Sequence, residues 1–287
     1  MRNRVKSIKR YGPGSGKYVW RGQIYHYPQA SYHGPSSGSM RSPVVRLVAL
    51  FTVLAFAGLA LILSLPGLRF PALDFIVESG RLGQDPALRQ LQTAVVQIKV
   101  IARQDSAFGF LSASQRSGTG FNIHPGGAIV TNHHVISEAV KITATFSGGE
   151  TYNAQSWVSW PELDLAIVYL DAPDLPRVYP SLTGRVRTGE VLTIIGHPLG
   201  LNAIITRGTA GSYFFVSGIP TPVFDINAAI HRGNSGSPVF NAGGEVVGVV
   251  FGTIRRQEQG EPVTRGVAVP IANLVQMLET RDRTLDH

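Results

Sequence analysis

The pattern of apolar positions over the last two thirds of the chain predicts a β-rich domain. From about Leu91 to Val269, short runs of Val, Ile, Thr, Phe and Tyr alternate with Gly, Pro, Asn or Asp. Representative runs are TAVVQIKVIA (93–102), GAIVTNHHV (127–135), LAIVYL (165–170), EVLTIIG (190–196) and EVVGVVFG (245–252). Residues 271–278 (IANLVQML) show helical spacing instead. We therefore expect an all-β fold that a single helix closes.

A long apolar run lies nearer the N-terminus. Residues 47–65 contain nineteen consecutive residues without a charge, and Pro66 and Gly67 follow. At about 1.5 Å per residue a helix of this length spans about 28 Å, close to a bilayer's hydrocarbon thickness. A buried core helix is disfavoured because the run has no polar face, and a cleaved signal peptide because the run and its basic leader are both long. We predict a transmembrane helix at 44–66.

The N-terminal segment differs sharply in charge from the rest of the chain. Residues 1–46 carry nine basic side chains and no acidic one, which leaves 17 basic against 18 acidic residues elsewhere. Residues 1–43 are poor in aliphatic residues, so we expect a disordered, basic, cytoplasmic tail. Its charge either fixes the membrane topology or binds the anionic inner leaflet. Beyond the tail no basic excess indicates a nucleic-acid partner.

These patterns divide the chain into a tail, a membrane helix, a linker at 67–90 that has room for a short helix, and a folded domain at 91–281. The chain contains no cysteine. This excludes disulfides, Cys-ligated metal centres and a thiol nucleophile. We expect neither a cofactor nor a metal.

Three short motifs carry the candidate chemistry. They are TNHHV at 131–135, LDLAIV at 163–168 and GNSGSP at 233–238, and GTGF at 118–121 precedes the first. A serine nucleophile needs a base to take its proton, a carboxylate to orient that base, and donors that await an oxyanion. The order His, Asp, Ser is the order of the chymotrypsin fold, whereas subtilisins and α/β-hydrolases use other orders.

These motifs, together with the ending GVAVP at 266–270, resemble the trypsin-like serine proteases of the HtrA (Deg) type over roughly residues 91–280. The resemblance implies two six-stranded antiparallel β-barrels, at about 91–172 and 185–270. It also implies site roles: His134 as base, Asp164 as its orienter, Ser235 as nucleophile, and the N–H groups of Gly233 and Ser235 as the oxyanion hole.

The chain departs from the family's usual pattern in three respects. We expect no PDZ module after the domain, Gly236-Ser237-Pro238 replaces the usual Gly-Gly-Pro, and His231-Arg232 stands where Asn-Pro is common. The Gly-Ser-Pro form resembles the glutamyl endopeptidases of the same fold. The third departure changes the loop that would form the oxyanion hole.

Two neighbouring residues compete for the assigned roles. His133 adjoins His134, and the motif favours His134 as the base. Glu162 stands two positions before Asp164, and the Asp-Leu-Ala motif favours Asp164 as the orienter. Adjacent histidines on a strand diverge, which argues against a metal pair.

A specificity pocket follows from the resemblance. Its base would be Ala229, six residues before the nucleophile, and its walls would be Val250, Phe251, Gly252 and Gly266. An apolar pocket without a carboxylate favours cleavage after small or medium apolar residues.

The sequence thus predicts a serine endopeptidase that is anchored in the cytoplasmic (inner) membrane and cuts polypeptides on its periplasmic or extracellular side. A catalytically silent chaperone-like or binding module is the alternative from another class, and an esterase is a third hypothesis. The oligomeric state stays open.

Overall fold

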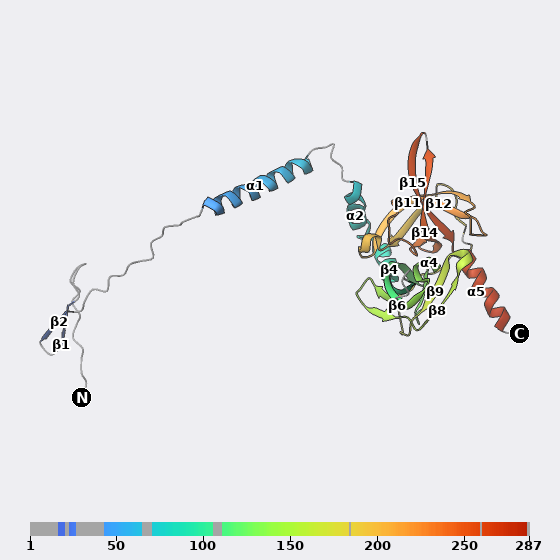
Figure 1. The fold of residues 1–287 in the computed structure, drawn as a ribbon, viewed down its shortest axis with the longest axis horizontal. Coiled ribbons are helices and arrows are strands. Elements are labelled where there is room, and N and C mark those ends of the chain that lie inside the picture. Colours follow the sequence, from blue (N-terminus) through green and yellow to red (C-terminus); the bar gives the residue numbers. More distant parts are fainter. Residues whose placement is uncertain are drawn as a thin grey trace, which may run out of the picture. The chain divides into compact units, whose positions relative to one another are not determined.

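The computed structural model describes residues 17–20, 23–26, 43–64, 71–105, 111–183, 185–258 and 260–285 (Figure 1). The chain divides into two compact units, residues 1–69 and 70–287.

The N-terminal unit contains a short hairpin and one helix. Strand β1 (Lys17–Trp20) pairs antiparallel with β2 (Gln23–His26), and helix α1 spans Pro43–Ser64. We had predicted disorder throughout 1–43, but these two strands lie within it, and their Tyr, Val, Trp and Ile residues favour strands. The rest of the tail lies outside the described residues. In the part of the chain that the structure describes, no helix meets the length and apolarity that crossing a membrane requires. The transmembrane helix at 44–66 stays a prediction, and residues 65–66 are not described.

The second unit begins with two helices in the segment that we expected to be a linker with room for one short helix. Helix α2 (Pro71–Leu82) packs on the second sheet, where Ser79 Oγ accepts a hydrogen bond of 2.9 Å from the Ile205 N–H. Helix α3 spans Pro86–Thr93, and the preceding residue, Asp85, is its N-cap: the Asp85 side chain accepts a hydrogen bond from Ala87 N at 2.9 Å. The compact unit therefore starts about twenty residues before the predicted boundary at 91.

The first sheet has seven antiparallel strands in the order β7-β6-β3-β4-β5-β9-β8. They are β3 (Val95–Asp105), β4 (Leu111–Asn122), β5 (Ala128–Thr131), β6 (Ala139–Phe146), β7 (Thr151–Asn153), β8 (Ser156–Trp160) and β9 (Leu165–Tyr169). The predicted count of six was wrong because one segment changes partner midway. Ala154 N donates to Ile142 O on β6, and the next residue, Gln155, donates to Tyr169 O on β9.

The second sheet is a closed six-stranded barrel in the order β10-β11-β12-β15-β14-β13, as expected for this half. Its strands are β10 (Val191–Gly196), β11 (Ile204–Phe214), β12 (Val223–Asn227), β13 (Pro238–Phe240), β14 (Val246–Glu258) and β15 (Glu261–Pro270). Figure 1 shows the β14–β15 ribbon projecting from this barrel. Helix α5 (Ala272–Leu285) follows and contains most of the helix predicted at 271–278.

The core joins the two sheets. One apolar cluster unites Phe121 and Leu165 of the first sheet with Ile205 and Val249 of the second, all fully buried, and Leu274 of α5 joins it. Each such side chain contributes about 1.5–3 kcal/mol through removal from water. Two further clusters fill the separate sheets. The loops where the sheets meet are thereby held against one another.

Candidate active site

The first predicted motif forms the end of β5 and a single helical turn. Helix α4 (His133–Ile136) follows Asn132, which is fully buried and donates from Nδ2 to Asp164 O at 2.9 Å. His133 N donates to the same carbonyl at 3.2 Å. Val135 and Ile136 are buried beneath the turn. The turn is thus fixed both by its apolar residues and by the segment that carries the second motif.

His134 is held by the carboxylate of Asp164. Its ring Nδ1 lies 2.7 Å from Asp164 Oδ2, and its backbone N–H donates to Oδ1 at 2.9 Å. The side chains of His134 and Asp164 are 47% and 16% exposed, so the ring edge remains open to solvent. With Nδ1 bound to a carboxylate, Nε2 is left as the nitrogen that can accept a proton.

Asp164 adopts an unusual backbone conformation that directs its carboxylate. It ends the short 3₁₀ helix η1 (Pro161–Leu163) in the left-handed region, with φ 51° and ψ 38°. Its N–H donates to Pro161 O at 3.1 Å. Asp is among the few non-glycine residues that tolerate this region, because its short side chain can hydrogen-bond locally. The local strain is offset by the bonds that Asp164 makes to the His134 turn.

The two competing residues lie elsewhere. His133 Nδ1 is 3.0 Å from Ser159 Oγ on β8, away from Asp164 Oδ2. Glu162 is exposed and makes no hydrogen bond or ion pair among the described residues. The geometry therefore favours His134 and Asp164 over these neighbours.

The loop that carries Ser235 is bound to strand β4 of the other sheet. Thr119 N donates to Ser235 O at 2.8 Å, and Thr119 Oγ1 donates to Gly233 O at 2.7 Å. Gly236 has φ +85°, and a β-carbon there would collide with Thr119 O. A glycine after the serine is thus required by this close approach. Thr119 of the GTGF motif is the residue that connects the two halves of the site.

The backbone amides beside Ser235 are free to bind a ligand. Neither Gly233 N nor Ser235 N donates a hydrogen bond to any residue in the described ranges. Gly233 has φ +102°, and a β-carbon there would collide with His197 O. Two free N–H groups beside a serine match the donor pair that an oxyanion needs.

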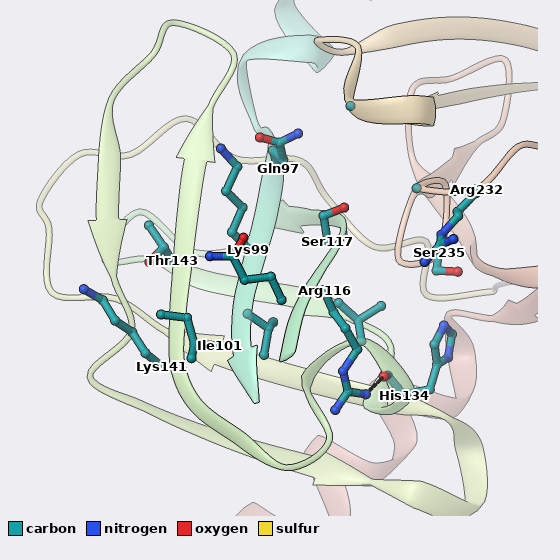
Figure 2. A pocket seen from close by; sticks show the side chains of 15 residues that line it. Gln97, Lys99, Ile101, Arg116, Ser117, His134, Lys141, Thr143, Arg232 and Ser235 are labelled. Atoms are coloured by element: carbon teal, nitrogen blue, oxygen red, sulfur yellow. Dashed lines mark hydrogen bonds between the residues drawn. The ribbon is translucent and has the colours of Figure 1, made fainter. Parts of the chain in front are cut away.

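Ser235 and His134 face one another across the meeting line of the two sheets, as Figure 2 shows. Within the described residues no hydrogen bond joins Ser235 Oγ to the ring. Such contacts are often loose before substrate binds. The arrangement brings a candidate nucleophile, base, orienter and amide pair to one place.

His231 has a structural role that the sequence did not reveal. Its ring packs on Phe75 of α2 with ring centroids 4.9 Å apart. The following residue, Arg232, accepts from Leu199 N at 2.8 Å through its carbonyl. Helix α2 and the loop at 197–201 therefore support the segment before Gly233. No short motif could have indicated this contact.

The predicted specificity pocket is only partly present. Val250 is fully buried and packs inside the barrel, because consecutive residues at the start of β14 are covered on both faces. Ala229 is exposed. A β-carbon on Gly266 would collide with Ile230, whereas the space around Gly252 is open. Ile230 thus occupies the space in front of Gly266. Phe251 is partly buried against the core that joins the two sheets.

A buried histidine lies directly beneath the amide pair. His197 precedes the 3₁₀ turn η2 (Pro198–Gly200), is 3% exposed, and donates its N–H to Thr119 Oγ1 at 3.0 Å. Burial lowers the pKa of its ring from 6.5 to about 4, and nearby Asn202 opposes this effect without cancelling it. Neither ring nitrogen has a partner at hydrogen-bonding distance among the described residues.

We predict that His197 makes stability fall in acid. In the unfolded chain the His197 ring takes up a proton near pH 6.5, whereas in the folded chain it does so only near pH 4. The free energy of unfolding is therefore highest above about pH 6.5 and decreases as the pH falls from 6.5 to 4. Between about pH 8 and pH 5, the free energy of unfolding should therefore fall by about 2 kcal/mol less in His197→Leu than in wild type. Urea unfolding at both pH values measures this. Exposed His124→Gln is the control, and an equal pH slope in His197→Leu and wild type would contradict the prediction.

The part of the chain that the structure describes contains no group of three His, Asp or Glu side chains that could hold a metal ion.

Comparisons with known proteins indicate the class of protein that this chain resembles. Residues 118–249 match the family model described as trypsin-like peptidase domain. Proteins described as probable periplasmic serine endoprotease DegP-like are 31% identical over 166 residues in Brucella suis and 36% identical over 140 residues in Chlamydia trachomatis. These matches cover 56% and 46% of this chain but only 32% and 27% of those proteins. The chain thus spans about a third or less of the length of these curated relatives.

Solved structures show the same fold. The HtrA-type protease AlgW with a decapeptide has a TM-score of 0.57 at 23% identity, over 68% of this chain and 66% of that one. A protease from M. tuberculosis in its active form has a TM-score of 0.57 at 25% identity, over 69% and 85%. The serine endoprotease from Yersinia pestis has a TM-score of 0.55 at 27% identity, over 68% and 64%. The fold is mostly β and chymotrypsin-like. The comparisons confirm that this chain is similar to the HtrA-type trypsin-like serine proteases.

Proposed function

We propose that the chain is a serine endopeptidase with His134, Asp164 and Ser235 as its catalytic triad. The observation that carries the proposal is the His134–Asp164 pair, 2.7 Å apart on one sheet, opposite Ser235 with its two free amides on the other. The similarity to serine endoproteases supports it. A structural serine turn would not need an oriented, half-exposed imidazole beside it.

The proposed reaction is acyl transfer to Ser235. His134 Nε2 takes the proton of Ser235 Oγ as the oxygen attacks the peptide carbonyl, and Asp164 stabilises the resulting imidazolium. The N–H groups of Gly233 and Ser235 stabilise the oxyanion. His134 then gives its proton to the leaving amine. In the second half of the reaction, His134 takes a proton from water, the water oxygen attacks the acyl carbonyl, and Ser235 Oγ leaves and receives the proton.

We propose cleavage after small or medium apolar residues. Ile230 and Phe251 are apolar and partly buried, and the space around Gly252 is open. Strand β14, which carries Phe251 and Gly252, is bound to the Ser235 loop, because Gly236 N donates to Val250 O at 2.8 Å. Each methylene is worth only about 1–3 kcal/mol in such a pocket, so selectivity should be broad.

Digestion of a peptide library tests both proposals together. We expect cleavage after Val, Ile, Leu, Ala or Met, and poor cleavage after Arg, Lys, Asp or Glu. The Ser235→Ala variant serves as the control for contaminating proteases. A dominant preference for a charged residue before the scissile bond would contradict the specificity, and equal digestion by Ser235→Ala would contradict the activity itself.

We also propose that the chain is anchored in the cytoplasmic membrane with the protease domain outside. The uncharged run at 47–65, the basic residues before it and the word periplasmic in the names of the relatives support this. Membrane fractionation of cells, with and without residues 1–66, tests it. Recovery of the full chain in the cytosol would count against the anchor.

A catalytically silent binding module is the second candidate. The missing hydrogen bond between Ser235 Oγ and His134 in the described structure favours it. A silent module would leave every library peptide intact while still binding some of them.

A further inference from the structure

A basic cleft extends from Ser235 across the outer face of the first sheet. Its volume is about 840 Å³, and His134, Gly233 and Ser235 form one end. Figure 2 shows Lys99, Ile101 and Lys141 at the other end. We call this the β3–β4–β6 cleft. It is continuous with the candidate active site.

The strand register explains how these side chains reach one face. Along β3, Val96, Ile98 and Val100 are buried, so Lys99 and Ile101 point outward. Lys99 pairs with Ser117 on β4 and with Thr143 on β6, while Ile101 pairs with Lys141 on β6. Ser117 stands two residues before Thr119, which bonds to Ser235. The polar face therefore leads directly to the nucleophile.

The charge of the cleft has a single sign. Among its described lining residues are four cations and no carboxylate: Lys99, Arg116, Lys141 and Arg232. None of the ion pairs of the described residues includes them. Arg116 donates to His134 O at 3.2 Å and to Ser137 O at 2.7 Å, both neutral acceptors. A concave site with uncompensated charge of one sign attracts ligands of the opposite sign.

The cleft lies on the side where the leaving group departs. His134 must protonate the leaving amine, so the substrate segment after the scissile bond passes His134. His134 and Val135 line the cleft, whereas Phe251 and Gly252 of the proposed apolar pocket do not. The cleft is thus separate from the surface that would hold the residue before the scissile bond.

We infer that this cleft selects polypeptides with acidic side chains after the scissile bond. The inference rests on the proposed function. At about 3.3 Å per residue, an extended substrate brings its second to fourth residue after the bond within reach of Lys99 and Lys141. Arg232 lies beside Gly233 and meets the nearer of these positions. Exposed Ile101 gives the same segment an apolar contact.

The test compares peptides that are identical except for Asp, Ala or Lys at the third position after the scissile bond. The measured quantity is the ratio of kcat/KM values for two peptides on one enzyme, so a general loss of activity cancels. Wild type should favour Asp over Lys by about tenfold, a factor consistent with two exposed ion pairs, and added salt should reduce the ratio. Lys99→Glu with Lys141→Glu should reverse the preference.

Arg187→Glu with Arg207→Glu is the matched control, because both arginines are exposed on the second half and neither lines the cleft. Reversal in the control as well, or an unchanged ratio in Lys99→Glu with Lys141→Glu, would overturn the inference. The inference would also be overturned if Lys99→Glu with Lys141→Glu lost binding to anionic lipid vesicles while its peptide ratio stayed unchanged. The cations would then bind a membrane rather than a substrate.

Binding of the Asp peptide to Ser235→Ala, followed by fluorescence anisotropy, separates this inference from the proposed function. Charge-selective binding without any cleavage by wild type would refute the endopeptidase and support the cleft. Cleavage by wild type with no charge preference would support the endopeptidase and refute the cleft.

Discussion

Replacing Ser235 or His134 by alanine should lower kcat by roughly 10⁴–10⁶-fold, because members of a nucleophile–base pair act as a unit. Ser235 carries the attacking oxygen, and His134 is the ring that Asp164 holds at 2.7 Å. Neither side chain belongs to the buried core, so both variants should fold. Turnover of a peptide ester or amide by each purified variant measures the loss.

His133→Ala is the matched control, because it removes the same ring one residue earlier. His133 contacts Ser159 rather than Asp164 Oδ2, so we expect far less loss. Equal losses in His133→Ala and His134→Ala, with folding intact, would mean that the base has been assigned to the wrong residue.

Asp164→Asn should lower kcat by about 10⁴-fold while changing KM little. The amide keeps the volume of the carboxylate but cannot stabilise the imidazolium, and it can favour the wrong tautomer of His134. The backbone bonds that Asp164 makes through its own N–H and carbonyl do not depend on the carboxylate, so the local turn should persist. Steady-state kinetics with the best library peptide gives kcat and KM separately.

Glu162→Gln removes a carboxylate two residues away and should leave kcat within about twofold, as expected for an exposed surface change. A comparable loss in Glu162→Gln and Asp164→Asn would indicate a general electrostatic effect rather than the specific orientation of His134.

The motifs lie where few backbone conformations are possible. Gly236 closely approaches Thr119 O, and Asp164 ends a 3₁₀ turn that faces His134. In both places the backbone geometry restricts the residue type, so the sequence carries a visible signal. The run at 93–102 likewise predicted β structure, and β3 spans Val95–Asp105.

Contacts between distant segments had no such signal. The packing of Phe75 on His231 joins a helix that we had expected to be a linker to the loop before Gly233. Ile230 over Gly266 closed part of an expected pocket, although both residues are ordinary for their positions. The four cations of the β3–β4–β6 cleft come from separate strands and a loop, and only the register brings them together.

Labelling with a fluorophosphonate probe tests the central claim most directly, because the probe reacts with an activated serine irrespective of peptide specificity. We expect residues 70–287, the second compact unit, to be labelled at Ser235 near neutral pH, and both Ser235→Ala and His134→Ala to remain unlabelled. Mass spectrometry of the labelled peptide identifies the modified residue. Absence of labelling in the folded wild-type protein between about pH 6 and pH 9 would contradict the account and favour the silent binding module.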